Sequence, residues 1–241
     1  MSTAPAITIC GHHAVAGRAL FAPVALRIGA GEWTCLLGPS GIGKTTLMRL
    51  VAGLACAGRF VGEIATSDGK PVSGRASFMA QTDLLLPWLS VLENAVLGAR
   101  LRGEAPDLPR ARALLCRIGL GAHLQARPRA LSGGMRQRVA LARTLLEDRP
   151  IAFLDEPFSA LDAQTRAAMQ ELAAESLAGK TVLLVTHDPA EAVRLGHQIV
   201  VLTAAGAHLY PVPPARTPRD AFAPDCVAAQ AGLMAILRGQ R

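Results

Sequence analysis

The segment GPSGIGKT, residues 38–45, has the residue types and spacing of a phosphate-binding loop. It follows an expected strand at 32–38 and opens an expected helix at 44–54, which is the context that such a loop requires. Glycines let the backbone N–H groups face phosphate oxygens, and the helix N-terminus adds its positive dipole end. Lys44 then contacts the β- and γ-phosphates, while the Thr45 hydroxyl coordinates Mg²⁺. The predicted nucleotide-binding residues are Gly38, Pro39, Ser40, Gly41, Ile42, Gly43, Lys44, Thr45 and Thr46.

Polar side chains end three of the expected strands. IAFLDEP puts Asp155 and Glu156 at the end of one strand, ASFMAQ ends in Gln81, and KTVLLVTH ends in His187. Ligands of open parallel sheets bind at the carboxyl ends of the strands. We expect Asp155 to hold Mg²⁺ and Glu156 to orient and deprotonate the attacking water. Gln81 can reach Mg²⁺ or that water, and His187 can contact the water or the γ-phosphate. The alternative is that these are ordinary polar residues at turns.

The segment LSGGMRQRVALAR, residues 131–143, weakens the start of a helix that is otherwise well patterned. Ser132 suits the N-cap position, because its hydroxyl can accept from an amide of the first turn. Gly133 and Gly134 follow at once, and each costs a helix about 1 kcal/mol relative to alanine. Glycines here indicate that another group comes very close to the backbone.

Strands and helices alternate along most of the chain. Apolar strands at 76–81, 150–156 and 180–187 have the pattern of parallel strands covered on both faces. With a further strand at 197–203, they predict an α/β fold with a mainly parallel sheet. Additional helices are expected at 107–118, 134–147, 162–178 and 188–196.

Three regions depart from this alternation. Residues 1–31 have the pattern of an antiparallel β start, with turns at Gly17 and at 29–31. Residues 82–140 lose the strand signals and are punctuated by prolines, so we expect an inserted helical subdomain. The tail at 204–241, rich in alanine and proline, is too short to form a further domain.

Composition limits the class of protein. The chain has 241 residues, of which 51% are hydrophobic and 4% aromatic, so an aliphatic core is expected. Its five cysteines are scattered and odd in number, which favours a reduced compartment in which they act as small apolar residues. The sequence has neither a secretory signal nor 18 consecutive apolar residues, so we expect a cytoplasmic protein. The net charge of +7 fits either a solvated arginine-rich surface or an affinity for nucleic acid or anionic membranes.

Taken together, these motifs resemble the ATP-binding subunit of an ABC transporter over roughly residues 6–203. The resemblance rests on the phosphate loop, Gln81, LSGGM at 131–135, IAFLDE at 151–156, SALD at 159–162 and His187. It implies a single ATPase domain, residues 1–241, with a P-loop NTPase core that uses ATP and Mg²⁺. It also implies a head-to-tail dimer, in which Ser132, Gly133 and Gly134 of one chain contact the γ-phosphate held by the other. Asp162 and Ser159 then lie at the dimer seam.

One position departs from the family. Such ATPases usually stack an aromatic residue on adenine, and the matching position here is Val15. His12 and His13 either replace that ring or are exposed polar side chains, so the adenine site stays unassigned.

LLPW and VLEN, in the segment TDLLLPWLSVLENAVLGARLRG that follows Gln81, resemble importers of nitrate, sulfonates, taurine and pyrimidine precursors of thiamine. Residues 31–47 and 141–163 favour the hydroxymethylpyrimidine (thiamine-precursor) branch among these. In that family the segment after Gln81 contacts the membrane subunits. The resemblance therefore implies separate permease subunits, an external solute-binding protein and a peripheral position on the cytoplasmic face of the inner membrane. A helix start at Pro87 with a packed Trp88 indole is the alternative interpretation of part of this segment.

Two rival functions remain. A soluble ABC ATPase acting on DNA or ribosomes has slight support from the basic charge, but long coiled-coil heptads and a second phosphate loop are absent from the sequence. We therefore expect no nucleic-acid partner. A non-hydrolysing regulatory cassette is opposed by the presence of Glu156 and His187.

Overall fold

In the computed structural model, which describes residues 4–239, the chain forms two units. The first takes in the described residues up to Ala76, then Pro150–Asp155, and the described residues from Leu177 onward. The second comprises Ser77–Arg149 and Glu156–Ser176. The chain thus leaves the first unit and returns to it twice, and each unit is assembled from separate stretches of sequence.

An antiparallel sheet begins the first unit. It contains β1 (Ile7–Val15), β2 (Arg18–Ile28) and β4 (Arg59–Thr66) in the order β2-β1-β4. The register places Ile7 opposite both Ile28 and Thr66. This sheet confirms the expected antiparallel start. The strand β4 was not predicted, because Gly62 interrupts its apolar alternation and Val61 points outward.

A mainly parallel sheet forms the centre of the first unit. Its strands are β3 (Trp33–Leu37), β6 (Ile151–Asp155), β7 (Thr181–Val185), β8 (Gln198–Thr203) and β9 (Gly206–Tyr210), in the order β6-β7-β3-β8-β9. All pairings are parallel except that of β9 with β8. Every residue of β3, β6 and β7 is buried, as expected for aliphatic strands that are covered on both faces.

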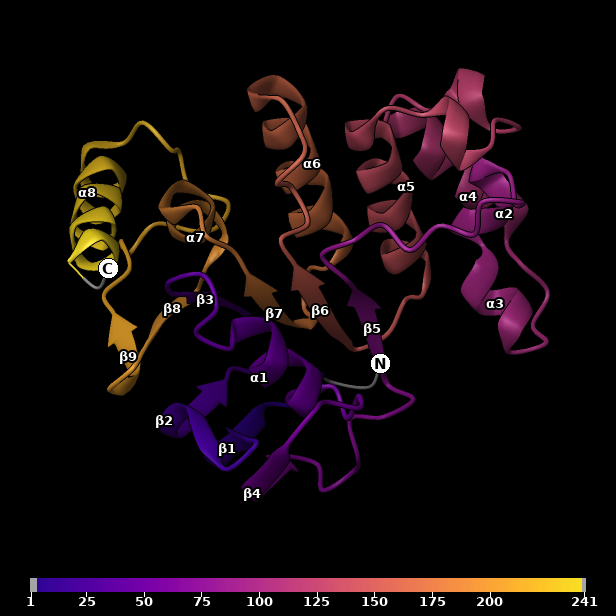
Figure 1. Cartoon of the computed structure of the whole chain (residues 1–241). Coiled ribbons are helices and arrows are strands. Elements are labelled where there is room, and N and C mark those ends of the chain that lie inside the picture. The colour runs from indigo at the N-terminus through magenta and orange to yellow at the C-terminus, as the bar shows by residue number, and fades with distance from the viewer. Residues whose placement is uncertain (1–3, 240–241) are drawn as a thin grey trace. The chain divides into compact units, whose positions relative to one another are not determined.

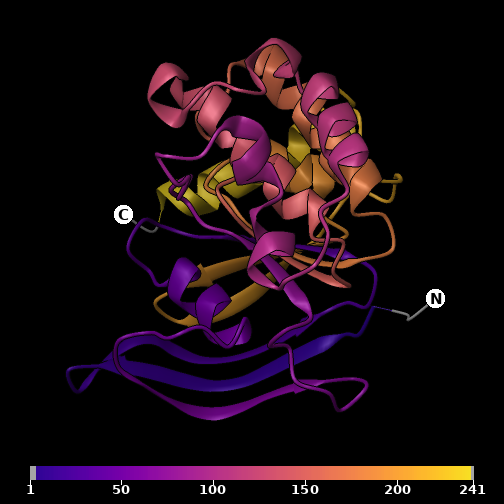
Figure 2. The same ribbon diagram turned by 90° about the vertical axis from the view of Figure 1, so that its right-hand side faces the viewer.

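Helices cover both faces of this sheet. Helix α1 (Lys44–Val51) lies on the face turned toward the antiparallel sheet, while α7 (Pro189–Leu195) and α8 (Pro224–Arg238) lie on the other (Figures 1 and 2). The arrangement confirms the predicted α/β class. Its functional consequence is that the loops after β3, β6 and β7 all leave the carboxyl edge of one sheet.

The tail contains regular structure that the sequence analysis did not predict. Strand β9 extends the sheet, and α8 packs through the buried side chains of Cys226 and Leu233. Tyr210 of β9 donates from its hydroxyl to the Ala229 carbonyl of α8 at 3.1 Å. The buried Arg219 guanidinium donates to the carbonyls of Val193, Gly196 and Pro213 at 2.7–2.9 Å. These bonds make the tail an integral part of the first unit.

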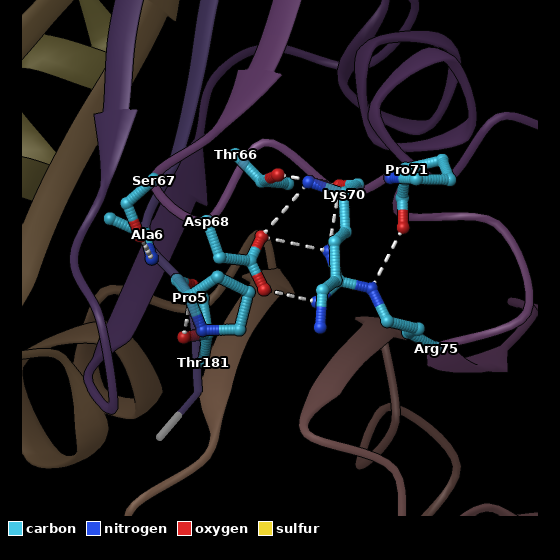
Figure 3. Close-up of polar contacts among 9 residues, drawn as sticks. All are labelled: Pro5, Ala6, Thr66, Ser67, Asp68, Lys70, Pro71, Arg75 and Thr181. Carbon is cyan, nitrogen blue, oxygen red and sulfur yellow. Dashed lines mark hydrogen bonds and ion pairs between the residues drawn. The ribbon is translucent and has the colours of Figure 1, made fainter. Parts of the chain in front are cut away.

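The loop between β4 and the next strand has a defined shape, set by one arginine (Figure 3). Arg75 forms an ion pair with Asp68 at 2.6 Å and donates to the carbonyls of Lys70 and Pro71 at 2.7 and 2.8 Å. The hydrogen bond from Arg75 holds the pKa of the Asp68 carboxyl well below its usual range. At the other end of the loop, Ser67 accepts from the Ala6 backbone N–H at 3.0 Å.

The second unit is mostly helical. After β5 (Ala76–Met79) come α2 (Val91–Ala95), α3 (Leu97–Leu101), α4 (Leu108–Arg117), α5 (Gly133–Leu146) and α6 (Ala163–Ser176). This confirms the inserted helical segment as a feature of the fold, and the unit also includes α6. In the described part of the chain, neither unit contains a helix with the length and apolarity needed to cross a membrane.

The cysteines are all free thiols. Cys35 and Cys226 are buried, and burial raises the pKa of both thiols, so they act as small apolar residues. Cys10 and Cys116 are exposed, so that interpretation is wrong for them.

Candidate nucleotide site

The loop between β3 and α1 has a backbone that requires glycine. Gly41 and Gly43 have φ values of 81° and 99°, and Gly43 is the N-cap of α1. A Cβ on Gly43 would lie 3.0 Å from the side chains of Leu20 and Phe21, and one on Gly38 would lie 2.4 Å from the Leu202 carbonyl oxygen. The conformation places the loop at the N-terminus of α1, where anions are favoured.

Lys44 holds this loop in shape from the inside. Its buried Nζ donates to the carbonyl oxygens of Gly38 and Pro39 at 2.8 and 2.9 Å. The ammonium therefore lies within the concave side of the loop, one residue after the N-cap of α1.

Thr45 and Asp155 place two hard oxygen atoms side by side. The Thr45 hydroxyl donates to Asp155 Oδ2 at 2.9 Å, and Asp155, at the end of β6, is only 1% exposed. A hydroxyl and a carboxylate at this separation suit Mg²⁺, which prefers oxygen ligands together with substrate phosphates. Both residues belong to the first unit, and the donor set fits the predicted metal.

His187 lies on a short loop whose neighbours are fixed by hydrogen bonds. It is exposed, two residues beyond the end of β7. The Thr186 hydroxyl donates to Glu191 Oε2 at 2.6 Å and accepts from the Asp188 backbone N–H at 3.0 Å. Asp188 in turn caps α7 by accepting from the Ala190 N–H at 2.8 Å. The imidazole is thus carried by a well-braced turn at the carboxyl edge of the sheet.

The remaining predicted site residues belong to the second unit. Gln81 is exposed, just beyond the end of β5. Ser132 caps α5, as its sequence position predicts, and its hydroxyl accepts from the Met135 N–H at 3.3 Å. The two glycines after it differ. A Cβ on Gly133 would have nothing closer than Arg136 Nη2 at 4.0 Å, whereas one on Gly134 would lie 3.1 Å from the Ala160 carbonyl oxygen.

Glu156 adopts a backbone conformation that is rare for residues other than glycine. Its φ is +50°, immediately after the end of β6. Such left-handed residues persist only where the surroundings hold them, and they cluster at functional sites. The following turn is held by Gln137 of α5, which sequence reasoning did not single out. Its isolated polar position on an apolar helix face was the available signal.

Asp162 begins α6. Its carboxylate accepts from the Thr165 backbone N–H at 3.0 Å, and this bond holds the pKa of the Asp162 carboxyl below its usual value. Ser159, nearby in the same turn, is exposed, and its hydroxyl donates to the Glu156 carbonyl oxygen at 3.1 Å.

The two histidines near the adenine position differ from expectation. His13 is 1% exposed, its Nε2 lies 2.8 Å from the Ala57 carbonyl oxygen, and its ring stacks on Phe21 with centroids 6.3 Å apart. It is therefore part of the core of the antiparallel sheet, and the interpretation of both histidines as exposed is wrong. His12 and Val15 are half-buried.

A pocket of about 550 Å³ adjoins the phosphate loop in the first unit. It is lined by Pro39–Ile42 and by Thr203–Ala205 of the β8–β9 turn. The pocket therefore leaves open space between this part of the phosphate loop and the β8–β9 turn.

The loop before α2 exposes two large apolar side chains, Leu84 at 63% and Trp88 at 64%. Arg143 holds this loop by donating to the Leu84 carbonyl at 3.0 Å, and Arg136 donates to the Asp83 carboxylate at 3.0 Å. The buried Asn94 amide bonds both the N–H and the carbonyl of Leu86. The Trp88 indole is therefore not packed, and a firmly held loop presents it to solvent.

Comparison with known protein families identifies the chain. A profile described as ABC transporter matches residues 21–159, which include the phosphate loop, LSGG and Glu156. This chain belongs to the ABC transporter family. It is an ATPase of that family, and the soluble alternative acting on DNA or ribosomes is not favoured.

Several curated relatives of this ABC transporter chain are similar over most of their length. One from Haemophilus influenzae, an uncharacterized ABC transporter ATP-binding protein, is 44% identical over 80% of this chain and 79% of the relative. An aliphatic sulfonates import ATP-binding protein of Rhodococcus jostii is 46% identical over 75% and 72% of the two chains. A taurine import ATP-binding protein of Yersinia pestis is 42% identical over 78% and 75%.

A solved structure shows the same fold. It is a dimeric ATP-binding cassette in a post-hydrolysis state, bound to ADP and Pi. The match has a TM-score of 0.73 and 28% identity, and it covers 89% of this ABC transporter chain and 99% of that cassette. The P-loop NTPase core predicted from the sequence is confirmed.

Proposed function

We propose that this chain is the ATP-hydrolysing subunit of an importer for small organic sulfonates, with taurine in that class. The observation that carries the proposal is the similarity to relatives named for the import of aliphatic sulfonates and taurine. The sulfonate would bind the permease and not this chain. The substrate class is therefore inferred from the similarity to these relatives, and the ATPase role from the residues of the nucleotide site. The hydroxymethylpyrimidine and nitrate importers are the competing substrate classes.

The nucleotide phosphates bind the loop at Gly38–Thr46, where amides of the loop and the N-terminus of α1 face the anion. Lys44 contacts the β- and γ-phosphates. Glu156 orients the attacking water and accepts its proton, and His187 and Gln81 contact that water or the γ-phosphate. The support is geometric for the loop and rests on the family motif for Gln81 and His187.

Mg²⁺ is held by Thr45 and Asp155, with Gln81 as a further ligand. When bound, the ion neutralises charge that develops on the phosphate oxygens. The adjacent hydroxyl and buried carboxylate of Thr45 and Asp155 support this assignment. In the free chain the same pair is joined by a hydrogen bond, which the Thr45 hydroxyl would give up in order to hold an ion.

Two copies of the chain act together, each as a single ATPase domain spanning residues 1–241. Ser132, Gly133 and Gly134 of one copy meet the γ-phosphate bound by the other, and Asp162 lies at the seam. Exposure of Ser132 and Gly133 at the start of α5 supports this role, because a capped helix N-terminus with no Cβ in the way suits an anion. The related cassette that is dimeric adds to the support.

The permease subunits dock on the loop that carries Leu84 and Trp88. Exposed apolar side chains on a loop fixed by buried polar bonds are a typical feature of protein interfaces. The chain is thereby held at the cytoplasmic face of the inner membrane, and an external binding protein delivers the solute. Nucleic acid has no part in this cycle.

Growth on defined sulfur sources tests the proposal. The host cell is deleted for this chain and grown with taurine, an alkanesulfonate or sulfate as sole sulfur source. We expect growth on sulfate only, with sulfonate growth restored by the wild-type chain but not by Glu156→Gln. Sulfonate growth that survives the deletion, with loss of nitrate or hydroxymethylpyrimidine uptake instead, would overturn the substrate assignment.

A further inference from the structure

Both the nitrogen and the oxygen of the Gln137 side-chain amide form hydrogen bonds to one turn of the second unit, residues 156–160. It lies on α5, one turn after Gly133, and is 7% exposed. Its Nε2 donates to the Glu156 carbonyl oxygen at 3.0 Å and to Ser159 Oγ at 3.1 Å. Its Oε1 accepts from the Ala160 backbone N–H at 2.8 Å. A single buried side chain therefore connects α5 to three groups of the 156–160 turn.

The same turn contains the left-handed residue. Glu156 has a φ of +50°, a conformation that relaxes to the right-handed or extended regions unless neighbours oppose it. Its carbonyl oxygen accepts from both Gln137 and Ser159, which fixes the peptide plane that follows Glu156. With β6 ending one residue earlier, the Glu156 backbone is fixed on both sides.

Close packing at Gly134 adds a second link between α5 and this turn. A Cβ there would lie 3.1 Å from the Ala160 carbonyl oxygen and 3.4 Å from Leu161 Cδ2. The first turn of α5 thus lies directly against the backbone of residues 160–161. An alanine at this position would have to displace either the helical turn or the loop.

We propose that Gln137 is a positioning residue, which holds Glu156 in its reactive backbone conformation and couples it to the first turn of α5. The inference rests on the proposed function, in which Ser132 and Gly133 contact the partner's nucleotide. Closure on that nucleotide presses on the N-terminus of α5, and Gln137 passes the displacement to Glu156 of the same chain. Binding at one ATP site thereby sets the general base of the other.

Steady-state kinetics of the full-length chain, assembled with its permease subunits and given MgATP, test this inference. We expect Gln137→Ala to lower kcat about a hundredfold, the scale of a misplaced catalytic group, while KM stays within about twofold. Gln137→Glu keeps the acceptor for Ala160 but loses the N–H donors, and we expect a similar fall in kcat. The matched control is Gln170→Ala, which removes an equally buried glutamine from α6.

Two further variants keep the test decisive if Gln137→Ala folds poorly. Ser159→Ala changes an exposed residue and removes one of the two side-chain hydrogen bonds to the Glu156 carbonyl, so kcat should fall severalfold with an unchanged melting temperature. In a Glu156→Gln background, Gln137→Ala should not lower the residual turnover further, because its effect passes through Glu156.

The outcomes separate the two proposals. Full kcat in Gln137→Ala, or an equal loss in Gln170→Ala, would overturn the positioning role while leaving the ATPase assignment intact. A wild-type complex that does not hydrolyse MgATP would overturn the proposed function itself.

Discussion

The phosphate loop of the first unit and the start of α5 in the second unit both place glycines at a helix N-terminus, yet for different reasons. In the loop, Gly41 and Gly43 have positive φ, so the backbone path itself demands them. At the start of α5 the glycines are helical, and the structure explains only Gly134, through its approach to Ala160. Gly133 has open space around it, so no contact within the unit explains why this position is a glycine. We infer that a group from outside the unit approaches it.

This difference shows how each half of the site is organised. The loop is complete by itself, because Lys44 and the Thr45–Asp155 pair already hold it in shape. The N-terminus of α5 has a capping serine followed by two glycines without side chains, and none of the residues Ser132–Gly134 is charged. We infer that the first half retains nucleotide and that the second half matters only when a nucleotide is brought to it.

The largest expected effect separates ATP binding from ATP hydrolysis. Glu156→Gln removes the proton acceptor but leaves the phosphate loop untouched, so kcat should fall about 10²–10⁴-fold while the Kd for ATP changes little. Equilibrium nucleotide binding and phosphate release measure the two quantities. Glu175→Gln, an exposed change on α6, is the control and should retain full activity. Comparable hydrolysis in both variants would contradict the role of Glu156.

The next effect concerns the metal pair of the loop. Thr45→Val removes the hydroxyl, so we expect the Mg²⁺ concentration for half-maximal ATPase activity to rise by at least about tenfold. The free chain should also lose about 1 kcal/mol of unfolding free energy, since the buried Asp155 carboxylate loses a hydrogen bond. Thr45→Ser restores the hydroxyl and should restore both. An unchanged Mg²⁺ requirement in Thr45→Val would remove Thr45 from the metal site.

The contrast between Gly133 and Gly134 gives a test in which stability and activity move in opposite directions. Gly133→Ala adds a Cβ in open space, so the free energy of unfolding should rise by up to about 1 kcal/mol from helix propensity. Turnover should nevertheless fall about tenfold or more, because the methyl group separates the amide from the partner's phosphate.

Gly134→Ala is the matched variant. Its Cβ meets the Ala160 carbonyl, so the melting temperature should lie below that of Gly133→Ala. Thermal melting and ATPase rates of the two proteins decide the point. If Gly133→Ala is more stable and fully active, the α5 terminus does not contact nucleotide.

The smallest effect is a pH dependence at Asp162. Its pKa in the folded chain lies below the ordinary value of 3.8, because the Thr165 N–H stabilises the carboxylate. The stabilisation is therefore present above the unfolded pKa and is lost as pH falls through the folded pKa. The melting-temperature gap between wild type and Asp162→Ala should be constant near neutral pH, narrow once pH falls below the unfolded pKa, and close when pH lies below the folded pKa.

Asp162→Asn keeps an oxygen that can cap the helix and should show a gap that does not vary with pH. A wild-type advantage over Asp162→Ala that persists unchanged in acid would show that the charge of Asp162 contributes nothing to the cap.

The sequence predicted the central sheet well, because β3, β6 and β7 are short, mostly apolar runs of the kind that parallel strands covered on both faces require. It also predicted the N-cap at Ser132 from one hydroxyl and the helix pattern after it. These features depend on neighbours along the chain, so they are readable without the fold.

Features that depend on distant contacts were missed. Strand β4 exists because β1 offers an edge to pair with, and its own pattern is interrupted at Gly62. His13 looks like an exposed polar residue until the fold places Ala57 and Phe21 beside it. The role of Gln137 likewise became visible only in the folded structure, where its side chain lies within hydrogen-bond distance of the Glu156 carbonyl. The spacing of the two residues along the chain does not predict that contact.

The structured tail, with β9 paired to β8 and Arg219 bonded to the end of α7, limits how far this protein can be shortened. Removing the chain from residue 204 onward would strip β9 from β8 and leave four consecutive buried aliphatic residues, Ile199–Leu202, along a naked sheet margin. An exposed hydrophobic edge strand pairs with strands of other chains, so the truncated protein would aggregate rather than act as a minimal ATPase.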